Sequence, residues 1–201
     1  MVLTSQKGRG KKIHILLDDE YVVTTDVDFW AENFIANETE IGDEEWQCLL
    51  EKINYRKAFN KCADLLSRRS HSIKELKVKL LHMVDENSAN KAINRFIELG
   101  YLDDRKFALE YTNYLVNTKN FSENHVRQEL FQKGIDKDII YEVLNEFEFD
   151  NSSAIINVIN KSYIRKLNTE NGKEKVIAAL MRKGFSYSDI KFALNNLENE
   201  L

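Results

Sequence analysis

The sequence predicts a mostly helical protein made of tandem three-helix repeats, preceded by a small β-hairpin and helix. Three observations lead to this fold class. The chain has 201 residues, of which 43% are hydrophobic and 31% charged, so it can form a core and is not a disordered chain. It contains 7 Gly and no Pro, too few turn formers for an all-β sandwich or barrel. One residue pattern also returns every 50 positions, which is typical of repeat architectures.

The N-terminal region predicts a short extension ahead of the repeats. We expect residues 1–12 to be a flexible basic tail. Two β-branched or aromatic runs then flank the turn-prone cluster Asp18-Asp19-Glu20, which predicts a hairpin over 13–25. A lone hairpin is only marginally stable in water, so it should pack on a helix that carries Phe29 and Trp30. The extension therefore covers residues 13–42.

A long helix is predicted from about 44 to 67. Gly42 marks a boundary between elements, and Asp43 is a suitable N-cap followed by Glu44 and Glu45 in the first turn. Cys48 and Cys62 fall on the apolar side of this helix, which predicts buried thiols. Two cysteines are too few for a disulfide framework and lack metal-ligand spacing.

The repeat aligns three copies without insertion. Residues in register are Leu76, Val126 and Val176, then Leu80, Leu130 and Leu180, and the pairs Lys133-Gly134 and Lys183-Gly184. Each copy predicts three helices. In the second, Ser122 opens the middle helix, Val126, Leu130 and Phe131 line it, and Gly134 ends it in a left-handed conformation.

The predicted repeats cover residues 43–102, 103–149 and 150–201. Because a three-helix unit of this size buries little surface alone, stacked units should share a core. We expect an elongated, curved array whose concave face suits binding along a groove or a filament.

The charges form blocks. Residues 13–50 carry eleven acidic residues and no Lys or Arg, whereas residues 51–82 carry nine basic and three acidic residues. With a net charge of −4, a uniformly basic nucleic-acid binder is not indicated, although a local basic surface remains open. No window approaches the roughly 18 apolar residues of a membrane span, and no apolar stretch follows the N-terminal charges. We therefore expect a cytoplasmic monomer without membrane contact.

The sequence lacks the motifs of an enzyme. It has no phosphate-binding loop motif, and its four histidines show no metal-ligand spacing, so they are interpreted as surface residues. The pair Asp103-Asp104 could indicate a metal site or acid–base chemistry. Its position at the start of a helix favours capping. We predict no catalytic residue, no metal and no cofactor.

Basic residues cluster around the junction between the long helix and the next one. Cations at a helix C-terminus can simply compensate its dipole, or they can form a patch for phosphate or for an acidic protein surface. Arg127, on the exposed face of its helix, could extend the patch over a second repeat. The predicted contact residues are Arg68, Arg69, Lys74, Lys77, Lys79, Arg105, Lys106 and Arg127.

Three segments resemble the RecX regulatory proteins. The string ADLLSRRSHS at 63–72, with Glu75-Leu76 and Lys79-Leu80, is similar to the first-repeat motif of that family. The string LGYLDDRKFA at 99–108 is similar to the second motif, and RQELFQKGI at 127–135 to the third. The chain departs from the family at Arg69-Ser70-His71-Ser72, where Arg-Pro-Arg-Ser is common.

The resemblance implies a protein that is not an enzyme. Such proteins bind the nucleoprotein filament of the RecA recombinase on single-stranded DNA, and typically suppress its ATPase activity and strand exchange. It implies a role in DNA recombination, DNA repair and the SOS response. The alternative is a helix–turn–helix-type protein that binds DNA without RecA, because three-helix units resemble such readers. Weak contact with single- or double-stranded DNA is compatible with both.

Overall fold

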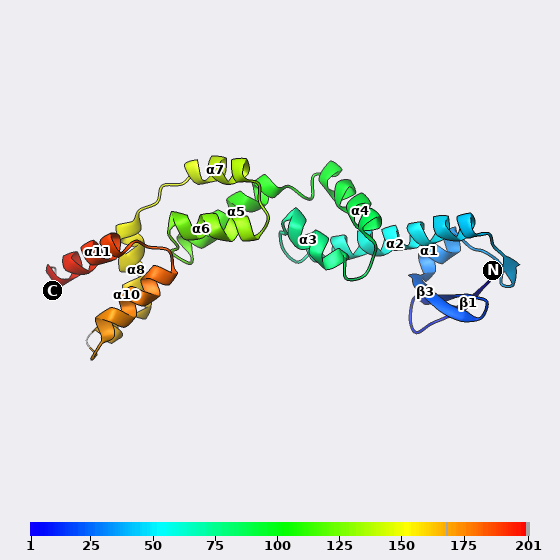
Figure 1. The fold of residues 1–201 in the computed structure, drawn as a ribbon, viewed down its shortest axis with the longest axis horizontal. Coiled ribbons are helices and arrows are strands. Elements are labelled where there is room, and N and C mark those ends of the chain that lie inside the picture. The colour runs from blue at the N-terminus through cyan, green and yellow to red at the C-terminus, as the bar shows by residue number, and fades with distance from the viewer. Residues whose placement is uncertain (168, 200–201) are drawn as a thin grey trace. The chain divides into compact units, whose positions relative to one another are not determined.

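The computed structural model describes residues 1–167 and 169–199 (Figure 1). The chain divides into two units, and one boundary between them falls within the helix Ile73–Leu80. The first combines Met1–His71 with Glu75–Leu102, and the second combines Ser72–Lys74 with Asp103–Leu201.

The first unit begins with a four-stranded antiparallel sheet in the order β3-β2-β1-β4. Its strands are β1 (Val2–Lys7), β2 (Lys12–Leu17), β3 (Glu20–Asp26) and β4 (Thr39–Glu40). The predicted hairpin is confirmed as β2 and β3, with Leu17 opposite Glu20. Asp18 and Asp19 both have positive φ, as the two-residue turn between twisted strands requires.

The expectation of a flexible tail over residues 1–12 is wrong. Residues 2–7 form β1, which pairs with β2 so that Leu3 lies opposite Leu17. Leu3 is fully buried, and its burial holds the strand on the hydrophobic core. The basic residues that suggested a tail lie at the end of β1, in the following turn and at the start of β2.

Two helices cover the core of this sheet. Helix α1 (Val27–Glu32) begins at Asp26, whose carboxylate accepts the N–H of Phe29 at 2.8 Å. The predicted long helix is α2 (Asp43–Leu66). Its N-cap is Gly42 rather than the predicted Asp43, because Glu45 reaches back to accept the Gly42 N–H at 3.2 Å. The shared core contains Phe29, Trp30, Trp46, Leu49 and Ile53.

The C-terminal half of α2 belongs to a three-helix arrangement with α3 (Ile73–Leu80) and α4 (Glu86–Glu98). Helices α2 and α4 pack together, and the rings of Phe59 and Phe96 lie 4.8 Å apart. Asp85 caps α4 by accepting the Ser88 N–H at 2.9 Å.

The second unit contains two further sets of helices. The first set is α5 (Asp104–Asn117), α6 (Glu123–Gln132) and α7 (Lys137–Asn145). The second set is α8 (Asn151–Ser162), α10 (Gly172–Arg182) and α11 (Tyr187–Asn199), with the short α9 (Ile164–Leu167) between α8 and α10. Asn171 does not cap α10 through its side chain, because it takes the left-handed conformation.

The 50-residue register is preserved in the structure. Leu80, Leu130 and Leu180 are all fully buried at equivalent positions of α3, α6 and α10. The predicted boundaries of the three repeats and the curvature of the array stay predictions.

A recurring junction follows the middle helices of the second and third repeats, α6 and α10. The carbonyl of Lys133, at the end of α6, accepts a hydrogen bond from the Ser72 hydroxyl at 2.7 Å. One repeat later, the carbonyl of Lys183 accepts the Ser122 N–H at 3.2 Å. The glycine that follows each lysine has positive φ, at Gly134 and Gly184. The Lys-Gly pairs therefore end a helix and also contact the start of the preceding middle helix.

Candidate interaction surfaces

The eight predicted contact residues do not form one described site. Arg68, Arg69, Lys77 and Lys79 lie in the first unit, and Lys74, Arg105, Lys106 and Arg127 lie in the second. Each set is therefore considered by itself.

The two arginines at the end of α2 are exposed but paired with carboxylates. A guanidinium nitrogen of Arg68 lies 2.7 Å from the Asp64 carboxylate, and the Arg68 side chain is 71% exposed. Arg69 lies 3.2 Å from the Glu75 carboxylate and donates to the Ser70 carbonyl at 2.8 Å. Exposed ion pairs contribute only about 0–1 kcal/mol, so a partner carboxylate or phosphate can replace them at small cost.

Two lysines of α3 belong to the same predicted set of contacts. The ammonium of Lys77 lies 2.7 Å from the Glu86 carboxylate. Lys79 is exposed, and no ion pair is found for it among the described residues. The first-unit basic surface consists of these two lysines with Arg68 and Arg69.

His71, within this junction, is buried, so the expectation of a surface histidine is wrong there. Its Nδ1–H donates to the Arg69 carbonyl at 2.9 Å. Burial lowers the pKa of His71, and the Arg69 charge lowers it further, while the hydrogen bond opposes the shift. Folding therefore favours the neutral form of the imidazole.

This burial makes stability depend on pH. Unfolding returns His71 to its ordinary pKa of about 6.5, so the unfolded chain binds more protons below that pH. The stabilisation is present above about pH 6.5 and is lost as the pH falls through the lowered pKa. Urea unfolding measures the free energy of unfolding at pH 7.5 and at pH 5.5. The decrease in this free energy between the two pH values should be smaller for His71→Gln than for the wild type. His82→Gln, at an exposed histidine, should keep the wild-type difference; equal behaviour of the two variants would contradict this account.

The second-unit cations have several roles. Arg105 lies 2.6 Å from the Glu146 carboxylate, and Lys106 is exposed beside it. Lys74 donates to the Gln132 carbonyl at 3.3 Å, so it helps to hold the junction between repeats. Arg127 lies 2.6 Å from the Glu123 carboxylate one turn earlier on α6.

The pair Asp103-Asp104 caps helices, as predicted. The Asp103 carboxylate accepts the N–H groups of Arg105 and Lys106 at 2.8 and 3.1 Å, at the start of α5. Asp104 accepts the Ile73 N–H at 2.9 Å, at the start of α3. Burial raises the pKa of Asp104, and the neighbouring Asp103 charge adds to this, while the Ile73 N–H opposes it.

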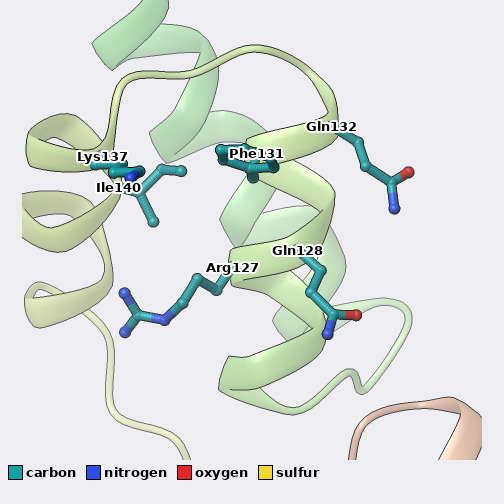
Figure 2. Close-up of a pocket in the computed structure, with 6 residues that line it drawn as sticks. All are labelled: Arg127, Gln128, Phe131, Gln132, Lys137 and Ile140. Carbon is teal, nitrogen blue, oxygen red and sulfur yellow. The ribbon is translucent and has the colours of Figure 1, made fainter.

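The structure also shows a half-open cleft of about 420 Å³ between α6 and α7. Figure 2 shows Phe131 between the two helices, next to Ile140, with the Arg127 side chain reaching across toward α7. Its lining residues are Arg127, Gln128, Phe131, Gln132, Lys137 and Ile140. The sequence pattern groups Phe131 with Val126 and Leu130, which are fully buried, but Phe131 is 59% exposed. We refer to this feature as the α6–α7 cleft.

A signal in the sequence could have revealed the exposure of Phe131. The residue directly follows the buried Leu130, so it lies on a different face of the helix. Its repeat equivalents are Leu81 and Met181, which also follow a buried leucine and are also exposed. In each repeat, therefore, the apolar residue directly after the buried leucine of the middle helix faces solvent.

The two cysteines differ in their exposure. Cys62 is buried, and burial raises the pKa of its thiol to about 11. Cys48 is exposed, which corrects the prediction that both thiols are buried. In the parts of the chain that the structure describes, no group of His, Cys, Asp and Glu residues is placed to hold a metal ion. Within the same residues, no helix is both long and apolar enough to cross a membrane.

Comparison with known proteins identifies both three-helix arrangements. Residues 58–96 match the first three-helix domain of RecX, and residues 103–144 match the second. The chain is 28% identical to regulatory protein RecX of Clostridioides difficile (strain 630) over 200 residues, which covers 98% of this chain and 94% of that protein. It is 32% identical to regulatory protein RecX of Chlorobium phaeobacteroides (strain BS1) over 144 residues, which covers 71% of this chain and 94% of that one.

Solved structures show the same fold. A crystal structure of regulatory protein RecX superposes with a TM-score of 0.63 at 22% identity, over 96% of this chain and 97% of the other. The crystal structure of RecX from Lactobacillus salivarius superposes with a TM-score of 0.58 at 25% identity, over 72% of this chain and 97% of the other.

Proposed function

The chain belongs to the RecX family of regulatory proteins, which are not enzymes, and from that premise we propose that it regulates the RecA recombinase by binding the RecA filament on single-stranded DNA. The observation that supports this most strongly is the match of both three-helix domains to those of RecX. We propose that the protein is a negative regulator that suppresses ATP hydrolysis and strand exchange. It acts as a cytoplasmic monomer.

The proposed mode of binding is occupancy of the filament groove. Repeated helical units suit a polymer of identical subunits, because equivalent side chains can meet equivalent surfaces on successive protomers. A protein that binds one conformation of the filament better than another shifts the population toward the first. Suppressed ATP hydrolysis then follows from stabilising an inactive filament conformation.

The eight predicted basic residues are proposed as the contacts, through two surfaces. The first-unit basic surface, around Arg68 and Arg69, would exchange its own surface ion pairs for carboxylates or phosphates of the filament. In the second unit, Arg105, Lys106 and Arg127 would do the same, while Lys74 contributes mainly by holding the repeat junction.

The test is ATP hydrolysis by RecA on single-stranded DNA, titrated with the full chain. We expect the rate to fall as the protein is added. Inhibition well below one protein per RecA would indicate capping or destabilisation of a cooperative assembly, and inhibition near one to one would indicate occupancy along the groove. An unchanged rate at a large excess of protein would contradict the proposal.

Helix–turn–helix-type binding of DNA without RecA is the competing function, because Arg68 to Lys79 lie at a junction between two helices. The net charge of −4 opposes tight binding to a polyanion. Tight binding to bare DNA that falls steeply with salt, together with unchanged RecA activity, would favour it.

A further inference from the structure

We propose that the α6–α7 cleft receives a segment of the RecA protein in which a large apolar side chain stands next to a carboxylate. This inference rests on the proposed function and assigns one contact of that interaction. The ring of Phe131 and the side chain of Ile140 would contact the apolar side chain. Arg127 and Lys137, at the mouth, would bind the carboxylate.

The exposure of Phe131 is the first observation behind this proposal. An aromatic side chain that is 59% exposed on the wall of a cleft leaves apolar surface in water, whose removal on binding is favourable. Next to it, Ile140 is almost fully buried and belongs to the core of the second unit. The cleft floor is thus held in place by the packed core.

The charges select the kind of partner. Arg127 and Lys137 are the cations of α6 and α7, whereas the same two helices carry four carboxylates, at Glu123, Glu129, Asp138 and Glu142. The lining of the cleft itself includes these two cations and no carboxylate, so it attracts one anionic group. A nucleic-acid backbone, with a phosphate at every nucleotide, would extend beyond the cleft over helices that carry more carboxylates than cations. A single carboxylate beside an apolar side chain needs only the two cations at the mouth. Charge complementarity therefore favours a protein segment over a nucleic acid.

The combination of lining residues is specific to the second repeat. At the position of Ile140, the first repeat has Asn90, which removes the apolar floor. At the position of Arg127, the third repeat has Ile177, which removes the cation. Leu81 and Met181 are exposed like Phe131, but they lack this combination of an apolar floor and a neighbouring cation. We therefore assign the contact with RecA to the second repeat alone.

Phe131→Ser tests the cleft, with Phe192→Ser as the matched control. Phe192 is an aromatic residue of α11 that is 62% exposed and does not line the cleft. We expect Phe131→Ser to weaken binding of the full chain to RecA filaments by roughly tenfold or more, as for an anchor residue at the centre of an interface. Phe192→Ser should bind within about twofold of the wild type. Circular dichroism of each variant establishes that the helices are retained.

Arg127→Gln and Lys137→Gln extend the test to the charges. Each should weaken filament binding and reduce its dependence on salt, because one exposed cation no longer meets a carboxylate. Unchanged affinity and salt dependence in both variants would overturn the assignment of the carboxylate.

Photo-crosslinking identifies the occupant. With p-benzoylphenylalanine in place of Phe131, we expect a crosslink to a RecA peptide that has Asp or Glu within a few residues of the attached side chain. A crosslink to the DNA, or none while the protein is bound, would overturn the inference.

The outcomes separate this inference from the proposed function. If the wild type binds filaments and Phe131→Ser binds equally well, the cleft assignment fails and the regulation of RecA stands. If the wild type does not bind filaments, both fail.

Discussion

Gly184→Ala is expected to lower the free energy of unfolding by about 2–5 kcal/mol. Gly184 has φ +84°, a conformation that costs an L-residue about 1–2 kcal/mol. A Cβ there would also lie 2.4 Å from the Ser122 Oγ and 2.8 Å from the His125 Cβ. Overpacking of this kind costs about 1–3 kcal/mol, and these contacts belong to the junction between the second and third repeats.

Gly100→Ala is the control for backbone conformation alone. Gly100 has φ +73°, but nothing lies within 4 Å of the position of its Cβ. Gly100→Ala should therefore lower the free energy of unfolding only by the cost of the left-handed conformation, about 1–2 kcal/mol.

Urea unfolding followed by circular dichroism compares the two glycine variants. The tryptophans, Trp30 and Trp46, both belong to the first unit, so their fluorescence monitors that unit separately. We expect Gly184→Ala to shift the circular dichroism transition more than the fluorescence transition. If both variants lost the same free energy of unfolding, the close contact with Ser122 would not contribute to the destabilisation.

Arg68→Gln combined with Arg69→Gln is expected to weaken binding to RecA filaments by about tenfold, while the free energy of unfolding changes by less than about 1 kcal/mol. The binding loss follows from removing two exposed cations from one surface. The small change in stability follows because both arginines form only surface ion pairs, with Asp64 and Glu75. Glutamine is preferred to glutamate here, since reversal would place like charges beside those carboxylates.

Lys91→Gln combined with Arg95→Gln is the matched control. These residues of α4 are also exposed and paired, with Glu51 and Glu98, but they lie outside the predicted contact residues. The control pair should bind filaments as the wild type does. Equal loss in both double variants would mean that net charge, and not the first-unit basic surface, determines binding.

Much of the fold could be predicted from the sequence because the repeat fixes the register. Leu80, Leu130 and Leu180 identify one buried position in three helices, and Gly134 and Gly184 identify where two of these helices end. The Asp18-Asp19 turn predicted the hairpin because Asp tolerates the left-handed conformation.

The parts that could not be predicted depend on long-range contacts. Strand β1 was missed because only its pairing with β2 buries Leu3, and the charges around Lys7 obscured its alternation. His71 is buried by packing at the helix junction, although its sequence neighbours are polar or charged. The short helix α9 has no counterpart in the other repeats.

The candidate site was predicted only as a set of charges. Exposed cations could be found from helical periodicity, but the acidic partners of Arg105 lie about 40 positions away in the sequence. The α6–α7 cleft was missed because helical periodicity grouped Phe131 with the apolar residues Val126 and Leu130.

The most direct test of the central claim, that the partner is a protein filament, is the affinity of the full chain for single-stranded DNA with and without a RecA coat, measured over a range of salt. We predict that the protein binds the RecA-coated strand more tightly than the bare strand at each salt concentration. Equal or tighter binding to bare DNA, falling steeply with salt, would contradict the claim and assign the basic surface to nucleic acid.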